Sequence, residues 1–119
     1  MVKDNFLDYI YRISSFYKEE ICGFICSNSI FFLENISSQK KTSFLIDPNR
    51  YFKVLEDSEI DFCFHSHYDR GPEPSEADIE ISNTSLIPFL IVSVPQKKFC
   101  IYKPSEKEAI YFSNSKCIM

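Results

Sequence analysis

The two histidines of the chain lie two residues apart, as His65 and His67. The stretch before them, 60–64, reads Ile-Asp-Phe-Cys-Phe, and its alternation of strand-forming residues predicts a strand that runs into His65. Side chains of a strand alternate between its two faces. If the strand continues, both imidazoles lie on one face and Ser66 points to the other. Two imidazoles on one side of a strand end can bind a single metal ion.

A turn and a helix start follow the histidines. The segment 71–74, Gly-Pro-Glu-Pro, marks the turn, and 75–78, Ser-Glu-Ala-Asp, opens a helix with Asp78 in its first turn. A catalytic zinc ion takes three nitrogen or oxygen ligands from the protein and keeps one position open for water. Imidazole and carboxylate groups suit this ion. His65, His67 and Asp78 supply three such ligands, so a general base must come from elsewhere in the chain.

Each half of this pattern also has a purely structural explanation. Ser-x-x-Asp before a helix is a capping box, in which both side chains hydrogen-bond to the first turn. A His-x-His sequence on a strand is more often a surface or core feature than a metal site. The two explanations of Ser75 and Asp78 are compatible, because a cap places both side chains at the mouth of the turn. The compact combination of both histidines, the turn and Ser-x-x-Asp favours the metal site.

The spacing of these residues resembles the motif of the JAMM family of zinc metallopeptidases, also called MPN+ or Mov34-type. That motif has a distant Glu, then His-Ser/Thr-His, seven residues, Ser, two residues and Asp. Here the seven residues 68–74 separate His67 from Ser75, and two residues separate Ser75 from Asp78. The match to this part of the motif is complete.

The distant Glu of the motif is placed by a glycine. In the family it lies at a helix-to-strand junction, three residues before a Gly, and Glu20 has this relation to Gly23. Glu20, rather than Glu19, is therefore the predicted general base, although an isolated Glu ahead of a strand is usually a solvated surface carboxylate. The resemblance covers roughly residues 18–103.

The resemblance implies a fold, a cofactor and a set of roles. The family is likened to the cytidine-deaminase-like fold, uses one catalytic zinc ion and cuts peptide or isopeptide bonds, typically after the tail of ubiquitin-like proteins. Metal-free members of the wider family are scaffolds, and some enzymes are silent until a partner subunit binds. The implied roles in this chain are metal ligands at His65, His67 and Asp78, a base at Glu20 and an oxyanion donor at Ser75. Ser66 has a minor part in our interpretation, the stabilisation of the local backbone.

Three softer signals are similar to the tail-assembly proteins of long-tailed bacteriophages. They are Phe-Leu-Ile-Asp-Pro at 44–48 followed by Tyr51, Pro-Ser-Glu-Ala-Asp at 74–78, and Ile-Val-Ser-Val-Pro at 91–95. Phage members often carry a second, cysteine-peptidase domain after the JAMM domain. This chain ends at Met119, so we expect a single domain, 1–119, with its core at about 18–103 and a frayed tail at 113–119.

Composition narrows the protein class. The chain has 119 residues, 45% of them hydrophobic, which is enough to fill one core. It shows no membrane-spanning run and no signal peptide, so we expect a cytoplasmic protein, in the host cytoplasm if it is phage-encoded. The formal net charge of −4 without a basic stripe argues against a nucleic-acid partner.

The five cysteines form no Cys-x-x-Cys pair and most lie in apolar runs, which predicts buried free thiols. A cysteine nucleophile is disfavoured, because both histidines are used by the metal site. A zinc-dependent deaminase is also disfavoured, because those enzymes combine Cys-x-x-Cys with His-x-Glu and the chain has neither motif.

Periodicity predicts helices and strands that alternate along the chain. The first helix, 5–17, should be amphipathic, be capped by Asp4 or Asn5 and cover one face of a sheet. The other predicted elements are a strand at 21–27, a turn at 28–29, strands at 30–36 and 42–46, a helix from Asp47 and Pro48 to 57–58, the strand into His65, a helix at 75–86, and strands at 89–94, 99–102 and 109–112. This order predicts an α/β or α+β sandwich, a mixed sheet flanked by helices.

The predicted function is hydrolysis of a peptide or isopeptide bond with zinc. The substrate would be a small linear peptide, a phage tail protein, a peptidoglycan-type peptide or a ubiquitin-like protein, and a partner subunit could be needed for activity. No long insertion lies between Asp78 and Lys103, so a bare groove or the neighbouring strand edge would have to hold the substrate. The alternative is a non-enzymatic assembly module of a phage tail or another complex.

Overall fold

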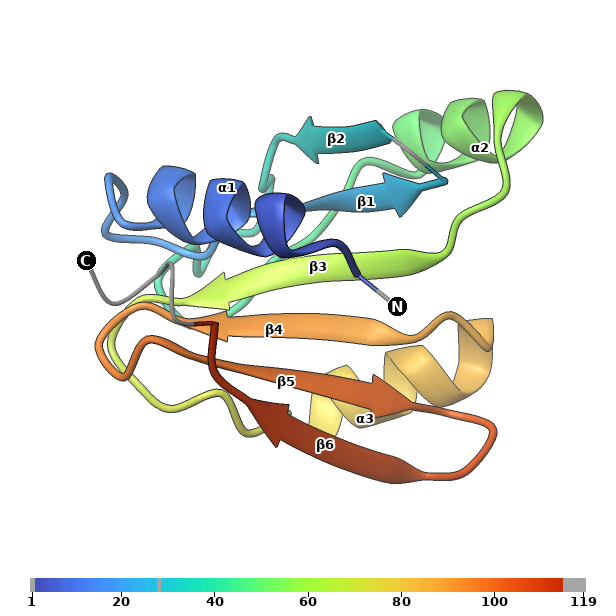
Figure 1. The fold of residues 1–119 in the computed structure, drawn as a ribbon. Helices are drawn as coiled ribbons and strands as arrows, with labels where there is room; N and C mark the ends of the chain where they lie inside the picture. Colours follow the sequence, from blue (N-terminus) through green and yellow to red (C-terminus); the bar gives the residue numbers. More distant parts are fainter. Residues whose placement is uncertain (1, 28, 115–119) are drawn as a thin grey trace.

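The computed structural model describes residues 2–27 and 29–114, which form one sheet with helices on both faces (Figure 1). The elements are, in order, α1 (Asp4–Ser14), β1 (Cys22–Cys26), β2 (Ser29–Leu33), α2 (Pro48–Asp57), β3 (Phe62–His67), α3 (Glu76–Ser85), β4 (Phe89–Ser93), β5 (Lys98–Lys103) and β6 (Glu108–Phe112). Within these described residues, no helix has the length and apolar character needed to cross a bilayer.

The sheet is mixed, as the sequence predicts. Its six strands lie in the order β2-β1-β3-β4-β5-β6. The central pair β3–β4 is parallel and every other pair is antiparallel. A parallel pair needs a crossover connection, and α3 supplies it. The carboxyl end of β3, the loop 68–75 and the start of α3 therefore lie at one edge of the sheet.

Helix α1 covers one face of the sheet, which confirms its predicted position. Leu7 and Ile10 are buried and belong to a core cluster with Phe64, Leu90 and Phe99 of the sheet. Helices α2 and α3 lie on the opposite face, where Tyr51 and Val54 of α2 and Ile79 of α3 pack against a second cluster. The buried members of that cluster are Phe24, Cys26, Cys63, Phe89 and Tyr102.

The predicted ends of α1 are wrong. Lys3 is at the N-cap position and makes no side-chain cap, so neither Asp4 nor Asn5 caps the helix. Asp4 lies in the first turn, where a carboxylate interacts favourably with the positive end of the helix dipole. The helix ends at Ser14, and Phe16 beyond it is 80% exposed. Apolar periodicity alone could not reveal this end, because Phe16 has the spacing of the buried face without a surface to pack against.

The predicted strand at 42–46 is also wrong, because this segment is an irregular loop. The side chain of Asn35 takes a backbone hydrogen bond that a strand in this segment would use: Asn35 Oδ1 accepts from the N–H groups of Ser37 and Leu45. The Asn35 amide also donates to the carbonyl of Ser43. These bonds hold the segment beside the sheet, and its residue Phe44 packs on His65.

The two later helices begin as predicted. Asp47 is the N-cap of α2, with Pro48 as the first helical residue, and its side chain accepts a hydrogen bond from Asn49 N–H. Ser75 is the N-cap of α3 and forms a reciprocal capping box with Asp78. The start of α3, and with it the position of Asp78, is therefore encoded locally.

Part of two predictions falls outside the described residues. The turn at 28–29 includes Asn28, and the frayed tail includes residues 115–119, none of which the structure describes. Ser29 already belongs to β2, and Asn114 is buried and donates a hydrogen bond to the carbonyl of Asp4. The predicted tail is thus anchored at least as far as Asn114.

Candidate metal centre

The two histidines face the same side of the sheet. Both are fully buried on β3, and their ring centroids are 5.1 Å apart. The side chain of Ser66, which lies between them, contacts the residue before β1: its Oγ accepts a hydrogen bond from Ile21 N–H at 2.9 Å. The predicted alternation along this strand is therefore present, and it places two imidazoles side by side at the end of β3.

Asp78 enters the same space from α3. Its Oδ2 atom lies 3.2 Å from His65 Nε2 and 3.7 Å from His67 Nε2, and the residue is 6% exposed. The same oxygen accepts the Ser75 N–H of the capping box at 2.9 Å. The capping role and a ligand role for Asp78 thus coexist in one geometry.

The environment of Asp78 favours its ionised form. Burial raises the pKa of this carboxyl, but the hydrogen bond to His65, the charge of His65, the nearby His67 ring and the Ser75 N–H outweigh burial and leave the pKa well below its ordinary value. An ionised carboxylate between two imidazoles is the charge state that a cation site requires.

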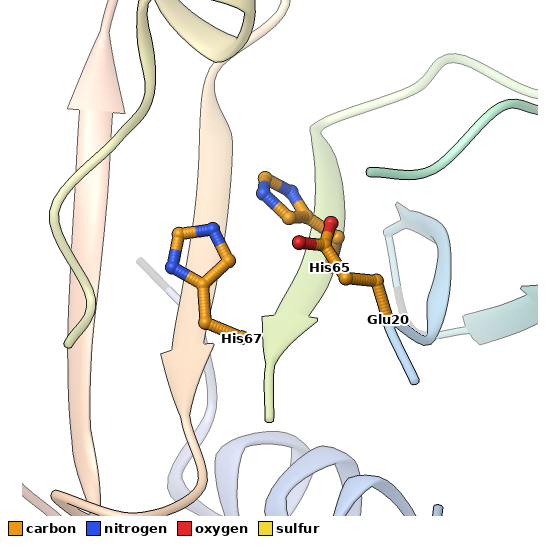
Figure 2. Close-up of side chains that lie close together, drawn as sticks. All are labelled: Glu20, His65 and His67. Atoms are coloured by element: carbon orange, nitrogen blue, oxygen red, sulfur yellow. The ribbon is translucent and has the colours of Figure 1, made fainter. Parts of the chain in front are cut away.

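Glu20 completes the group from the other side. It lies two residues before the start of β1, is 1% exposed, and has a carboxylate oxygen within 4.8 Å of a ring nitrogen of each histidine. Figure 2 shows its carboxylate pointing toward the imidazoles. The antiparallel pairing of Cys22 with His65 brings Glu20 to this position from a distant part of the sequence.

The backbone of Glu20 is held on both sides. Its N–H donates to the Lys40 carbonyl at 2.7 Å, and its carbonyl accepts from the Asn35 amide at 2.9 Å. The next residue, Ile21, exchanges two hydrogen bonds with Ser66, through the Ser66 hydroxyl and through the Ser66 N–H. The strand that carries the histidines therefore also positions the carboxylate.

The guanidinium group of Arg70 lies beside Glu20. Arg70, in the loop after β3, donates from Nη2 to Glu20 Oε2 at 2.7 Å. The Arg70 side chain is 36% exposed, whereas that of Glu20 is 2% exposed. The loop itself is anchored, because Ser93 Oγ donates to the Arg70 carbonyl at 2.7 Å. The pair keeps a positive charge next to a carboxylate that has almost no contact with water.

His67 is oriented as metal-binding histidines are. Its Nδ1 lies 2.7 Å from the Gly71 carbonyl, which can only accept, so Nδ1 carries the proton. The Nε2 of a neutral His67 is then a bare lone pair, and it is buried without a hydrogen-bond partner. His65 Nδ1 is also buried without one. A carbonyl behind one ring nitrogen and an unpartnered second nitrogen are the usual surroundings of a histidine ligand.

The distances from Asp78 to the two histidines are near those between ligands of one tetrahedral ion. Ligand atoms about 2.0–2.2 Å from a zinc ion at tetrahedral angles lie about 3.4 Å from one another. The distances from Asp78 Oδ2 to the two Nε2 atoms are 3.2 and 3.7 Å. The residues present therefore fit a metal ion, with Glu20, His65 and His67 as a buried group and Asp78 against both rings.

Ser75 lies at the rim of this site. It is exposed, and its Oγ accepts the Asp78 N–H at 3.1 Å, which leaves its own proton available to donate. The sequence-predicted residues Glu20, His65, His67, Ser75 and Asp78 are thus brought together by β1, β3 and α3.

The cysteines do not compete for this chemistry. Cys22, Cys26, Cys63 and Cys100 are buried and free, as predicted, and Cys117 lies outside the described residues. Burial, and then the charge of Glu20, raises the pKa of Cys22 to about 12. A thiol with this pKa stays protonated at neutral pH and is a poor nucleophile.

Comparison with solved structures identifies the fold. A JAB1/MPN-domain protein from Archaeoglobus fulgidus superposes with a TM-score of 0.63 at 16% identity, over 92% of this chain and 94% of that one. The chain has the JAB1/MPN fold. Two further structures share this fold. A protein from Desulfitobacterium hafniense superposes with a TM-score of 0.64 at 20% identity, over 92% of this chain and 84% of that one. A protein from Salinibacter ruber superposes with a TM-score of 0.56 at 18% identity, over 93% of this chain and 87% of that one.

Sequence comparison adds a relative with the predicted context. The JAB1/MPN chain is a homologue of tail tip assembly protein K of Escherichia phage N15, to which it is 30% identical over 84 residues, 67% of its length. It spans about a third, 35%, of that relative. No family model matches the chain. The predicted resemblance to the JAMM/MPN family and to phage tail-assembly proteins is confirmed.

Sequence reasoning missed two residues that surround the candidate metal centre. Arg70 lies in the loop after the histidines, and a basic residue in a loop does not reveal which carboxylate it pairs with. Asn35 is 9% exposed and holds the backbone of Glu20. A single Asn after a strand carries no distinguishing signal, because its four hydrogen bonds exist only once the loop 35–45 is folded.

Proposed function

We propose that this chain is a zinc-dependent hydrolase of peptide or isopeptide bonds. The observation that carries the proposal is the convergence of two buried imidazoles and two buried carboxylates at the end of β3. Buried ionisable groups are costly unless they are paired or bind an ion. The JAB1/MPN fold and the complete JAMM spacing support the same conclusion.

Geometry favours Asp78 as the third ligand and Glu20 as the base. One oxygen of Asp78 lies close to both Nε2 atoms, at distances near those expected around a tetrahedral ion. Glu20 instead has one oxygen bound by Arg70. A carboxylate that is held at the edge of the site and within reach of its centre suits proton transfer better than coordination.

The chain's own residues then have distinct tasks in hydrolysis. A zinc ion held by His65, His67 and Asp78 would supply an acidified water and a Lewis acid. Glu20 would accept a proton from the attacking water and pass it to the leaving amine. The exposed Ser75 hydroxyl would donate to the oxygen that develops negative charge, and one such donor is worth roughly 3 kcal/mol of barrier.

The name of the relative supports one substrate class. Protein K of phage N15 is named for tail tip assembly, so a tail protein or a peptide in the host cytoplasm is the substrate we favour. A ubiquitin-like protein is the other candidate, by resemblance to JAMM enzymes. A second subunit could be needed for activity. A non-enzymatic assembly module remains the alternative function, favoured by the name of the relative rather than by the site.

Metal content of the purified protein tests the proposal. We expect about one zinc per chain in the wild type and less than a tenth of that in His67→Ala, measured by elemental analysis. Glu106→Ala, in the exposed turn between β5 and β6, is the control and should bind zinc like the wild type. A wild type that takes up no zinc even when it is added back would contradict the hydrolase and support the assembly module.

A further inference from the structure

An apolar cavity of about 460 Å³ lies on the face of the sheet that also carries the metal centre. Its floor is formed by Phe24, Cys63 and Phe89 of the sheet. Its walls come from α2, which contributes Tyr51 and Phe52 among others, from the loop 44–46, and from α3. Cavities of this size are in the range that holds small ligands and large side chains.

The cavity adjoins the metal centre, because residues of its lining pack directly on His65. Cys63 in its floor lies two residues before His65 on β3, on the same face of the strand. Phe44 in its wall stacks on the His65 ring, with centroids 4.5 Å apart and an interplanar angle of 27°. Phe89 in its floor meets the same ring edge-on at 5.6 Å. The wall of the cavity is therefore also the packing shell of a proposed zinc ligand.

Helix α3 links the two sites in the same way. Its first turn carries Asp78, and its following turns contribute Ile81, Thr84 and Ser85 to the cavity wall. A group in the cavity and a group at the metal centre would thus lie along one helix, about one to two turns apart.

The chemistry of the lining selects an apolar occupant. Glu80 contributes the one carboxylate of the lining, and the other lining residues are apolar, aromatic or neutral. At the mouth, Leu45, Phe52 and Ile81 are 53%, 60% and 48% exposed, which is unusual for large apolar side chains on one rim. Apart from a cation that reached Glu80, a charged side chain would lose its hydration here without gaining a partner.

We infer that this cavity is the specificity pocket of the hydrolase and holds a large apolar side chain of the peptide substrate, next to the bond that is cut. The inference rests on the proposed function and names its substrate class: peptides or tails with Phe, Tyr, Leu, Ile or Met at one fixed position beside the scissile bond. Such a pocket discriminates through the free energy of apolar burial, about 10- to 200-fold between side chains that fill it differently.

Cleavage-site profiling tests the inference. The zinc-loaded protein is incubated with a mixture of peptides from a digested proteome, and new ends are mapped by mass spectrometry. We expect apolar residues to be enriched at least tenfold at one position. Ile81→Lys, at the rim, should lower that enrichment about tenfold, while Ile110→Lys, the same change on β6 outside the cavity, should leave it unchanged. Cuts without apolar preference, or a preference that survives Ile81→Lys, would overturn the pocket and leave the hydrolase standing.

A binding measurement that does not depend on catalysis separates failure of the pocket from failure of the proposed hydrolase. N-acetylphenylalaninamide is titrated into 15N-labelled protein, with N-acetylalaninamide as the matched ligand. We expect saturable shifts of the Phe44, Thr84 and Ser85 amides with the first ligand, at least tenfold weaker binding of the second, and loss of the shifts in Ile81→Lys but not in Ile110→Lys. Absence of these shifts overturns the pocket whatever the peptide mixture shows. Peptides left uncut by a zinc-loaded protein that shows the shifts would instead overturn the hydrolase, and with it the substrate role of the pocket.

Discussion

At the scale of single residues, the centre is built from groups that each have two functions. Asp78 completes a capping box and faces both histidines. Ser66 belongs to the central strand and ties down the residue after Glu20. This double use means that a substitution here affects folding and chemistry together, so a variant is informative only beside a control that affects folding alone.

The two carboxylates should respond differently to loss of charge. We expect Asp78→Asn to weaken zinc binding by 10- to 100-fold or more, because it removes a charged ligand. Glu20→Gln should keep zinc at about one per chain and lower peptide hydrolysis at least 100-fold, because it removes the base. Zinc titration with a competing chelator and single-turnover hydrolysis measure the two effects. Full hydrolysis by zinc-loaded Glu20→Gln would refute the assigned base.

Ser66→Ala should lower both stability and activity. It leaves the partly buried N–H of Ile21 without its side-chain acceptor, at a cost of about 1–3 kcal/mol in the free energy of unfolding. Ser82→Ala is the matched control, because Ser82 is equally buried and its hydroxyl bonds the Ile87 carbonyl away from Glu20. Urea unfolding should show similar losses for both variants, and only Ser66→Ala should slow hydrolysis. Equal hydrolysis by the two variants would show that Ser66 does not help to position Glu20.

At the scale of elements, three segments meet at one edge of the sheet: the start of β1, the end of β3 and the start of α3. The antiparallel β1–β3 pair brings in Glu20, and the β3-α3-β4 crossover brings in Asp78. Close approach of β1 and its neighbours depends on Gly23. A Cβ at this position would collide with the carbonyl oxygen of Phe31 and come within 2.6 Å of the Phe64 ring.

We therefore expect Gly23→Ala to lower the free energy of unfolding by about 2–3 kcal/mol, because backbone of β2 and a buried ring must both move. Gly71→Ala is the control: its Cβ would meet the flexible ends of Glu73 and Gln96, which can give way, so the loss should stay below about 1 kcal/mol. Chemical denaturation compares the two. Similar stability of both variants would show that the sheet tolerates a side chain at Gly23.

At the scale of the whole molecule, the two faces of the sheet differ in character. The face under α1 is a closed apolar core, and the face under α2 and α3 carries the candidate metal centre and the apolar cavity. Helix α2 has no fully buried residue, so this side is held together less tightly than the other. A bound ion that joins β3 to α3 should therefore stabilise the complete fold.

We expect zinc to raise the melting temperature. At a free concentration 100-fold above the dissociation constant, an ion that binds only the folded state adds about 2.7 kcal/mol. For a domain of this size that corresponds to roughly 10 °C. Differential scanning calorimetry with added zinc and with chelator measures the shift, and His67→Ala should show none. A wild type that melts at the same temperature under both conditions would indicate that no ion is held between β3 and α3.

The sequence by itself determined what is encoded by local spacing. His-Ser-His on an alternating strand and Ser-x-x-Asp at a helix start specify which side chains share a face and where α3 begins. Gly23, three residues after Glu20, marked the carboxylate only through the family resemblance. The order of elements was sufficient for the mixed sheet with helices on both faces, apart from the ends of α1 and the segment 42–46.

The tertiary structure decided what depends on groups far apart in the chain. Arg70 reaches Glu20 across 50 residues, and Asn35 forms its hydrogen bonds only when the loop 35–45 is folded against the start of β1. The cavity exists because α2 and α3 stand apart over Phe24, Cys63 and Phe89. Such features follow from packing and long-range electrostatics, and neither leaves a period or a spacing in the sequence.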